Sequence, residues 1–171
     1  MIRACTDRDL PAVCAIVNDA AQAYKGVIAE DRWHEPYMPL AELQGEIAAG
    51  VRFWGCEEGG ELAGVMGIQD RGEVDLIRHA YVKTSHRNRG IGTRLLTHIE
   101  SLSAKPILIG TWAAAGWAIR FYEKHGYRVL PREETERLLR RYWSVPERQI
   151  ATSVVLASPR WDAARGTRMA R

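Results

Sequence analysis

The sequence lacks the features that would place it in a membrane or in an oxidising compartment. Its 171 residues contain no apolar run near the ~18 residues that a membrane span requires, and no secretory signal pattern at the start. The three cysteines, Cys5, Cys14 and Cys56, are odd in number and widely spaced, with no pair at metal-ligand or redox spacing. We therefore expect a cytoplasmic protein with reduced cysteines, no metal site and no membrane partner.

Internal repeats, low-complexity tracts and a dominant charge are also missing. Charged residues make up 26% of the chain and hydrophobic residues 46%, with a net charge of +3, which suits one ordinary domain with a core. No basic face with interleaved aromatics is evident, so we expect no nucleic-acid partner. Part of the positive charge follows Pro159, in Arg160, Arg165, Arg168 and Arg171. The expected organisation is a domain over residues 1–158 and a solvated, frayed basic tail over residues 159–171.

Hydrophobic spacing and turn residues predict an alternation of strands and helices. Residues at helical spacing predict helices over residues 6–23, 39–49, 91–102, 114–125 and 131–141. Strand patterns cover residues 2–5, 51–57, 61–69, 73–82, 107–110, 127–130 and 149–156. Turn compositions between the second, third and fourth strands predict an antiparallel meander. The stretch 24–39, rich in aromatics and breakers, is expected to be a loop.

The most informative motif is the basic, glycine-bearing segment that joins the strand ending at Val82 to the next helix. Gly90 and Gly92 let the backbone approach a ligand closely, and the N–H groups of the helix start would face that ligand. Arg87 and Arg89 add positive charge, which suits a pyrophosphate better than a single carboxylate. The segment therefore predicts an anion site, although glycines that only punctuate a strand-to-helix connection would give the same pattern.

The spacing of these glycines excludes two common phosphate loops. A Walker-type loop needs four residues between its glycines and a following Lys-Ser/Thr, which this segment does not have. A dinucleotide-binding turn would need a third glycine where Leu95 stands. What remains is an Arg-x-x-Gly-x-Gly turn from Arg87 to Gly92.

This turn resembles the pyrophosphate-binding turn of the GNAT superfamily of acyl-CoA-dependent N-acetyltransferases, and the order of elements resembles the layout of that family over nearly the whole chain. The resemblance implies a mixed α/β fold, with a mostly antiparallel six- to seven-stranded sheet splayed between strands four and five and helices on both faces. It also implies acetyl-CoA as co-substrate, with its pantetheine arm paired to the backbone before the turn. The implied cofactor-binding residues are Ala80, Tyr81, Val82, Arg87, Asn88, Arg89, Gly90, Ile91, Gly92 and Thr93.

A second segment, residues 118–127, resembles the GNAT helix that ends at a glycine and an aromatic residue, and its tyrosine aligns with Tyr122. A phenol of pKa near ~10 can hydrogen-bond a thiolate of pKa ~8.5 and return a proton to it. The resemblance therefore implies that Tyr122 is the general acid, whereas its place on an apolar helix stripe would by itself suit a core tyrosine. Many relatives carry an asparagine where this chain has Ala115, so the carrier contacts of that asparagine are in question here.

The base that deprotonates the amine is expected on the strand before the turn, where such bases often lie in GNAT enzymes. Strand alternation puts Asp75 and His79 on one face with Ile77 and Tyr81. Imidazole can accept a proton near neutral pH, so His79 is the first candidate, with Glu73 and Asp75 as alternatives. Deprotonation by ordered water, with His79 as a polar strand residue, stays open.

Candidate acceptor-binding residues are aromatic and histidine side chains placed where GNAT enzymes line the acceptor pocket. They are Tyr24, Trp33, His34, Trp112 and Tyr142, with Trp143 paired to Tyr142 and Trp117 paired to Trp112. Aromatic rings with a few carboxylates suit a small cationic or zwitterionic amine, although tryptophan clusters are more often core.

The expected function is direct transfer of an acetyl group from acetyl-CoA to the primary amine of a small molecule or amino acid. Because GNAT relatives are frequently dimers, the resemblance also suggests a homodimer. A protein or peptide N-acetyltransferase is an alternative. So is a non-catalytic acyl-CoA sensor on the same fold, which would need no proton donor at Tyr122. A nucleic-acid binder would instead be indifferent to CoA.

Overall fold

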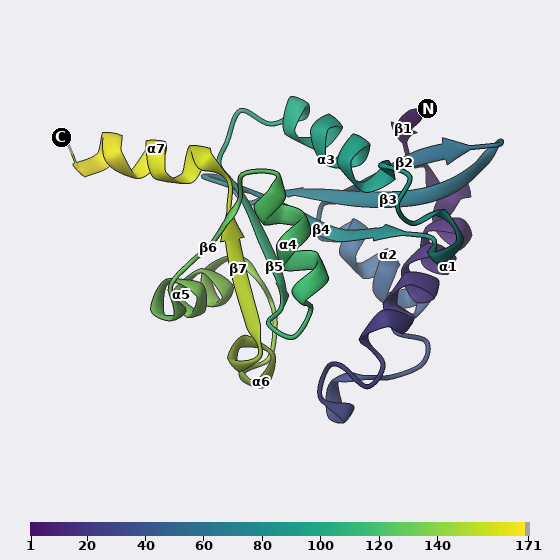
Figure 1. Ribbon diagram of the computed structural model, residues 1–171, viewed down its shortest axis with the longest axis horizontal. Coiled ribbons are helices and arrows are strands. Elements are labelled where there is room, and N and C mark those ends of the chain that lie inside the picture. The colour runs from purple at the N-terminus through teal and green to yellow at the C-terminus, as the bar shows by residue number, and fades with distance from the viewer. Residues whose placement is uncertain (170–171) are drawn as a thin grey trace.

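The computed structural model describes residues 1–169, and of residues 166–169 only the helical backbone. Within this part, seven strands form one sheet in the order β1-β2-β3-β4-β5-β7-β6 (Figure 1). Neighbouring strands are antiparallel except for the parallel pair β4 and β5, so the mostly antiparallel sheet is confirmed. The strands are β1 (Ile2–Ala4), β2 (Val51–Glu58), β3 (Glu61–Asp70), β4 (Asp75–Val82), β5 (Ile107–Trp112), β6 (Arg128–Val129) and β7 (Ser153–Ala157).

Helices cover both faces of the sheet, as predicted (Figure 1). Helices α3 and α4 pack on one face, and α1, α2, α5 and α6 pack on the other. The helices are α1 (Leu10–Ala21), α2 (Leu40–Ala48), α3 (Ile91–Leu102), α4 (Gly116–Lys124), α5 (Arg132–Tyr142), α6 (Glu147–Ala151) and α7 (Pro159–Met169). No helix in residues 1–169 combines the length and the apolar character needed to cross a membrane.

Strand alternation divides the core into layers above and below the sheet. Ile77 and Ile109 pack beneath α3 and α4, whereas Leu76 and Leu108 pack against α5 and α6 on the opposite face. All four side chains are buried, and each contributes about 1.5–3 kcal/mol relative to exposure. The sheet is thus held rigidly at its centre, where β4 and β5 run side by side.

The pairing of β4 and β5 ends soon after it begins. The two strands are paired only from Asp75↔Ile107 to Ile77↔Ile109. Beyond these positions β4 continues to Val82 and β5 to Trp112 without pairing to each other, so the sheet splays between its fourth and fifth strands as expected. The second half of β4 therefore presents backbone groups toward β5 that no ladder there engages.

The final strand is shorter than its sequence pattern predicted. Residues 149–151 belong to α6, and β7 begins at Ser153. Pro146 is the N-cap of α6, and Glu147 follows in its first turn, which suits the helix dipole. The strand assignment of residues 149–151 was therefore wrong, because a proline and an acidic residue at a helix start outweighed a short apolar run.

Residues 159–169 form a helix, where we expected a solvated, frayed tail. Helix α7 projects away from the sheet (Figure 1). Arg128 on β6 pairs with Asp162, and Trp161 Nε1 donates a hydrogen bond to Glu134 at 3.3 Å. These contacts attach the first turn of α7 to the domain. Arg171 of the predicted tail lies outside the described residues.

Candidate functional site

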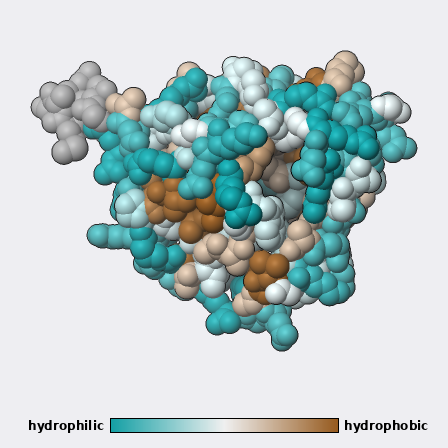
Figure 2. Space-filling view, in the orientation of Figure 1, coloured by the Kyte–Doolittle hydropathy of each residue, from teal (hydrophilic) through white to brown (hydrophobic). Residues whose placement is uncertain are grey.

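A cavity of about 650 Å³ opens where α3, α4, the end of α1 and the unpaired half of β4 approach one another. Figure 2 shows a recess in the middle of this face, with hydrophilic side chains around much of its rim. All of the predicted cofactor-binding residues except Arg89 line this cavity, and so do Tyr24 and Tyr122. The structure therefore brings together the two segments on which the sequence prediction depended. We call this space the first cavity.

The first turn of α3 supplies the backbone donors of this cavity. Gly90 is the N-cap of the helix and has a φ of 73°, a left-handed conformation that glycine adopts without strain. The N–H of Arg94 is the first to bond back within the helix, to the carbonyl of Gly90 at 3.0 Å. The N–H groups of Ile91, Gly92 and Thr93 therefore have no acceptor within the helix and can bind an anion.

The absence of a side chain at Gly92 also matters, for a reason of space. A Cβ atom there would lie 3.3 Å from the ring of Phe121 on α4, closer than most such contacts. The glycine thus lets the first turn of α3 approach α4 across the cavity. A strand-to-helix connection that glycines merely punctuate would not need this close approach.

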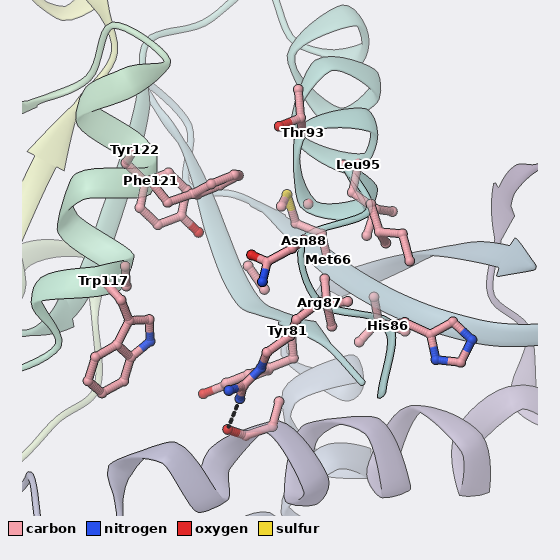
Figure 3. Close-up of a pocket in the computed structure, with 18 of the residues that line it drawn as sticks. Met66, Tyr81, His86, Arg87, Asn88, Thr93, Leu95, Trp117, Phe121 and Tyr122 are labelled. Carbon is pink, nitrogen blue, oxygen red and sulfur yellow. Dashed lines mark hydrogen bonds between the residues drawn. The ribbon is translucent and has the colours of Figure 1, made fainter. Parts of the chain in front are cut away.

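The two arginines of the turn lie differently. Arg87 lines the cavity, and its Nη2 donates a hydrogen bond to the carbonyl of Ala20 at 3.5 Å (Figure 3). Arg89 does not line the cavity, and its Nη1 is 4.0 Å from a carboxylate oxygen of Glu58 in the β2–β3 hairpin. Arg94 pairs with the same carboxylate. Only one of the two predicted arginines is therefore placed to contact a ligand in the cavity.

A bulge in β4 lies beside the cavity. The register slips between the pairs Gly67↔Arg78 and Val65↔Tyr81, so that two residues of β4 oppose one of β3. His79 is one of those two and has a φ of 51°, unusual for a residue other than glycine. Such bulges change the direction of side chains along a strand.

The bulge overturns the predicted alternation of β4. Ile77 packs beneath α3 and α4, whereas Tyr81 packs with residues of α1 and α2 on the other face. His79 contacts Glu46 of α2 on that same face. The prediction that Asp75, Ile77, His79 and Tyr81 share one face was therefore wrong, since a two-residue period does not survive an inserted residue.

Tyr122 projects from α4 toward the first cavity (Figure 3). Its ring is buried and meets those of Phe121 and Tyr127 edge-on, with centroids 5.1 and 5.8 Å apart. Burial raises the pKa of Tyr122 well above its usual range, so the phenol is protonated at neutral pH. The side chain is thus both a core residue and a proton-bearing group at the cavity wall.

His79 is paired with an acidic residue that sequence reasoning missed. Its Nε2 lies 3.3 Å from Oε2 of Glu46, and Arg78 Nη2 is 2.7 Å from the same oxygen. Burial alone would raise the pKa of Glu46, but its interactions with His79 and Arg78 together lower it. Glu46 is therefore a carboxylate beside the imidazole. No local pattern could have revealed this contact, because α2 and β4 meet only in the folded chain.

The two alternative bases lie away from both cavities. Asp75 accepts a hydrogen bond of 2.5 Å from the hydroxyl of Ser103 and lies 3.8 Å from Lys105 Nζ. Glu73 accepts hydrogen bonds from Arg141 and from the hydroxyl of Tyr142. Asp75 is the first residue of β4 and Glu73 precedes the strand, at the end where β4 pairs with β5. Neither residue lines a cavity, so neither is placed to accept a proton from an amine there.

A second, smaller cavity of about 130 Å³ lies on the other side of the splayed strands. His79 and Arg78 line it from β4, Trp112 from β5, and Trp143 from the segment after α5. Tyr24 and Tyr81 line both cavities. The two cavities therefore meet at these two tyrosine side chains.

Hydroxyl groups cluster where the cavities meet. The Tyr81 hydroxyl interacts with those of Tyr24 and Tyr37, and Trp112 Nε1 donates a hydrogen bond to the Tyr37 hydroxyl at 3.1 Å. Burial raises the pKa of Tyr37 to about 12 and raises the pKa values of Tyr24 and Tyr81 as well. The wall between the cavities is therefore made of neutral phenols at physiological pH.

Three predicted acceptor-binding residues do not line either cavity. Trp33 and His34 stack on Tyr37 from outside, with centroids 5.7 and 6.1 Å away. His34 is exposed, and its Nδ1 bonds to the carbonyl of Pro36 at 2.7 Å. Trp33 and His34 therefore pack against Tyr37, which lines the second cavity, and do not line the cavity themselves.

Tyr142 is the third of these residues. It is buried in the core beneath α5, with its hydroxyl 3.2 Å from Glu73. Its neighbour Trp143 lines the second cavity instead, over Gly110, where a Cβ atom would lie 3.2 Å from the indole ring. Helix α5 ends at Tyr142, and the extended backbone that follows turns the next side chain toward β5.

Two further features complete the surroundings. Ala115 is fully buried with Tyr24 and Trp112, so this position offers no amide to a ligand.

The loop before α2 is tied to α6 beside the second cavity, because Arg148 Nη2 donates a hydrogen bond to Asp31 at 3.0 Å. Across residues 1–169, no group of three or more His, Cys, Asp or Glu side chains is arranged to hold a metal ion.

A helix start with free N–H groups, an open strand edge and a buried phenol on the next helix are the features expected of a coenzyme-binding α/β transferase. Comparison with known families agrees with this class. Residues 49–129 match the family model described as the acetyltransferase (GNAT) domain. This part of the chain, which contains the turn from Arg87 to Gly92 and helix α4, is therefore similar to the GNAT acetyltransferase domain.

Solved structures share this fold at low sequence identity. PaiA N-acetyltransferase from Thermoplasma acidophilum, in complex with coenzyme A, aligns with a TM-score of 0.70 and 17% identity over 92% of this chain and 97% of that chain. The ribosomal-protein-S18-alanine N-acetyltransferase from Escherichia coli aligns with a TM-score of 0.65 and 17% identity over 94% of this chain and 93% of that chain.

N-acetylglutamate synthase from Neisseria gonorrhoeae, complexed with coenzyme A and N-acetyl-glutamate, aligns with a TM-score of 0.59 and 18% identity over 92% of this chain and 34% of that chain. A search of curated protein sequences gives no significant match.

Proposed function

We propose that the protein is an N-acetyltransferase that transfers an acetyl group from acetyl-CoA directly to the primary amine of a small molecule or amino acid. The observation that carries this proposal is the meeting of two cavities at the open edge of β4. One cavity has anion-binding backbone at its end, and the other contains an imidazole beside a carboxylate.

Acetyl-CoA would occupy the first cavity along its length. Its pyrophosphate would accept hydrogen bonds from the N–H groups at the start of α3, with Arg87 adding charge. Its pantetheine arm would pair with the open edge of β4 at residues 80–82, which leads the thioester to Tyr122. Coenzyme A in the solved structures of PaiA N-acetyltransferase and N-acetylglutamate synthase supports this choice of carrier.

The reaction is a direct acyl transfer. The amine nitrogen attacks the thioester carbonyl carbon, a C–N bond forms, and the C–S bond breaks. A backbone N–H at the bulge of β4 would stabilise the oxyanion that develops on the carbonyl oxygen. The amine loses one proton, and the departing thiolate gains one, so the products are the acetylated amine and CoA with a free thiol.

Tyr122 would supply the proton to the thiolate. Its raised pKa makes it a weaker acid than a free phenol, but the thiolate forms in the same desolvated cavity, where its own proton affinity rises too. The pKa values of the phenol and of the departing thiol thus remain close, and the phenol keeps its proton until negative charge develops on the sulfur.

His79 would accept the proton of the amine from the side of the second cavity. Glu46 faces Nε2, which leaves Nδ1 for the proton, and a carboxylate in this position fixes the tautomer and stabilises the imidazolium that forms. Arg78 holds the carboxylate from its other side at 2.7 Å. Glu46 is in this scheme a positioning residue for His79.

The size of the second cavity favours a small acceptor. At about 130 Å³ it holds the reacting end of an amine, a space of roughly four water volumes. The ion pair between Asp31 and Arg148 bridges the loop before α2 and α6 beside it, which narrows the approach for a folded protein. The lining includes the aromatic rings of Tyr24, Tyr37, Tyr81, Trp112 and Trp143, so a cationic amine could approach over a ring face.

The test is release of free thiol from acetyl-CoA across a panel of amines, amino acids and peptide N-termini. We expect turnover with small amines and little with peptides. Turnover with peptides alone would favour a protein or peptide N-acetyltransferase and reject the small-molecule proposal.

Binding of acetyl-CoA without turnover on any amine would favour the acyl-CoA sensor. Calorimetry that detects no binding of acetyl-CoA or CoA by the native chain would reject both readings. Arg87→Ala should weaken binding, and Gly90→Trp should abolish it, because any side chain at a φ of 73° is strained and an indole would fill the anion site.

A further inference from the structure

His125 joins the C-terminal end of α4 to the first turn of α3. Its Nδ1 lies 2.7 Å from the carbonyl oxygen of Phe121, and its Nε2 lies 3.1 Å from the hydroxyl of Thr93. Thr93 lines the first cavity, whereas His125 does not. The histidine therefore reaches the anion site through a single hydroxyl group.

These two contacts determine the direction of each hydrogen bond. A carbonyl oxygen only accepts, so Nδ1 of His125 must carry a proton. In the neutral ring Nε2 then has a lone pair, and the Thr93 hydroxyl must donate its only proton to it. A hydroxyl engaged in this way presents lone pairs to the cavity, which is unfavourable beside a phosphate oxygen.

Protonation of the ring reverses the second bond. With protons on both nitrogens, Nε2 of His125 donates to the Thr93 oxygen, and the hydroxyl proton becomes free to donate to an anion in the cavity. A charge-assisted hydrogen bond of this kind is also stronger than a neutral one.

We propose that His125 is a positioning residue whose protonation is coupled to binding of the CoA pyrophosphate, because it switches the Thr93 hydroxyl from a donor to histidine into a donor to phosphate. The coupling is reciprocal: the anion favours the protonated ring, and the protonated ring favours the anion. The inference rests on the proposed function, since it takes the pyrophosphate as the anion.

The charged groups around His125 leave this switch intact. On α4, Glu123 and Lys124 are exposed. On the neighbouring elements, Arg94 pairs with Glu58, Arg128 pairs with Asp162, and Glu100 accepts a hydrogen bond from Tyr127. The groups of the first cavity that face the same anion are His86, Arg87 and Lys124. Of these, His86 has an imidazole like His125, but its Nδ1 lies 2.8 Å from the Ser85 hydroxyl.

The experiment measures proton uptake when CoA binds. Calorimetry at pH 7 in two buffers of different ionisation enthalpy gives the number of protons bound per CoA, and repetition from pH 6 to 8 gives the pH dependence of Kd. We expect native protein to take up more protons than His125→Gln. The amide of Gln can keep both roles of the neutral ring but cannot take a proton. Between pH 6 and pH 8 the Kd of CoA should rise for both proteins, and the factor of increase should be roughly ten times larger for native protein than for His125→Gln.

Three further variants test the route through the hydroxyl. Thr93→Val removes the hydroxyl and should lose the extra proton uptake, whereas Thr93→Ser keeps the hydroxyl and should retain it. His86→Gln is the matched control for a histidine in the same cavity and should also retain it. Ionisation of the CoA phosphates is common to all proteins and cancels in the differences.

The outcomes separate this inference from the proposed function. Native protein that binds CoA with the same proton uptake as His125→Gln overturns the inference and leaves the proposed function in place. Loss of the uptake in His86→Gln but not in Thr93→Val overturns it too. No binding of CoA by the native protein rejects the proposed function itself. If His125→Gln fails to fold, the Thr93 pair still decides.

Discussion

The two cavities on either side of the open edge of β4 are assembled in different ways. Most of the first cavity comes from one stretch of chain, residues 80–95, with one helix placed opposite. The second draws its lining from many short segments between Tyr24 and Ser153. A site built from contiguous backbone leaves a motif in the sequence, whereas a site built from distant side chains does not.

The difference extends to the chemistry of the two spaces. In the proposed function the first cavity binds charge with backbone N–H groups, whose direction follows from helix geometry alone. The second relies on side chains such as Glu46 and Trp143, whose placement depends on how helices dock on the sheet. Mutations should therefore separate the two sites into independent effects on CoA and on the amine.

The largest effect should come from Tyr122, which lies at the end of the first cavity. Tyr122→Phe removes the proton donor but keeps the ring in its buried position, so turnover should fall about a hundredfold or more. Stopped assays of thiol release measure the rate, and calorimetry should show CoA affinity within about twofold of native. Unchanged turnover would remove Tyr122 from the mechanism.

A change at Gly110 should affect the amine alone. A Cβ atom there would lie 3.2 Å from the ring of Trp143, so Gly110→Val should push the indole into the second cavity. We expect Gly110→Val to raise the KM for the amine by about tenfold, which corresponds to roughly 1.4 kcal/mol. Gly110→Ala should raise it less. If both variants lost affinity for CoA by the same factor as they raised the KM for the amine, the two cavities would not be independent.

The arginines of the turn should differ in their effect on CoA. Arg87→Ala should raise the Kd of CoA by about five- to tenfold, because this guanidinium lines the first cavity. Arg89→Ala is the matched control, since Arg89 faces Glu58 instead, and its effect should be smaller. Calorimetric titration of both variants gives the comparison. Equal losses would mean that only net charge matters and not the placement of the side chain.

The smallest effect concerns acid stability. The pKa of Glu46 is lower in the folded chain than in the unfolded one, so its pairing contributes stability above the unfolded pKa of about 4.3 and loses it as pH falls through the lowered value. Glu46→Gln should remove this dependence. Thermal unfolding between pH 3 and 6 should show a difference in Tm between native and variant of roughly 2–4 °C at pH 6, shrinking toward pH 3. A difference that grows with acid would contradict the assignment.

Much of the fold was predictable because local patterns carried it. The β2–β3–β4 meander and the helix after Gly90 follow from alternation and turn chemistry, and both are confirmed. The bulge at His79 was not predictable, because an inserted residue leaves no mark on composition. Helix α7 was missed for a related reason, since its attachment depends on Glu134 and Arg128, which are distant in sequence.

The candidate site divides along the same line. Nine of the ten predicted cofactor-binding residues line the first cavity, whereas Trp33, His34 and Tyr142 line neither cavity. Trp143, predicted together with Tyr142, does line the second cavity, whereas Glu46 could be found only once α2 was placed on the sheet. The catalytic roles of Tyr122 and His79, the homodimer and the cytoplasmic location stay predictions.

Glu58 has a consequence for the kinetics of association. Its carboxylate at the β2–β3 hairpin pairs with Arg94 and lies 4.0 Å from Arg89, so part of the positive charge around the turn is already neutralised within the protein. Long-range attraction of a polyanion depends on the positive charge that Glu58 leaves unneutralised, and salt screens this attraction over about 8–10 Å. The rate at which CoA finds its site should therefore fall only modestly between low and physiological ionic strength. Removal of the Glu58 carboxylate should make that encounter both faster and more sensitive to salt.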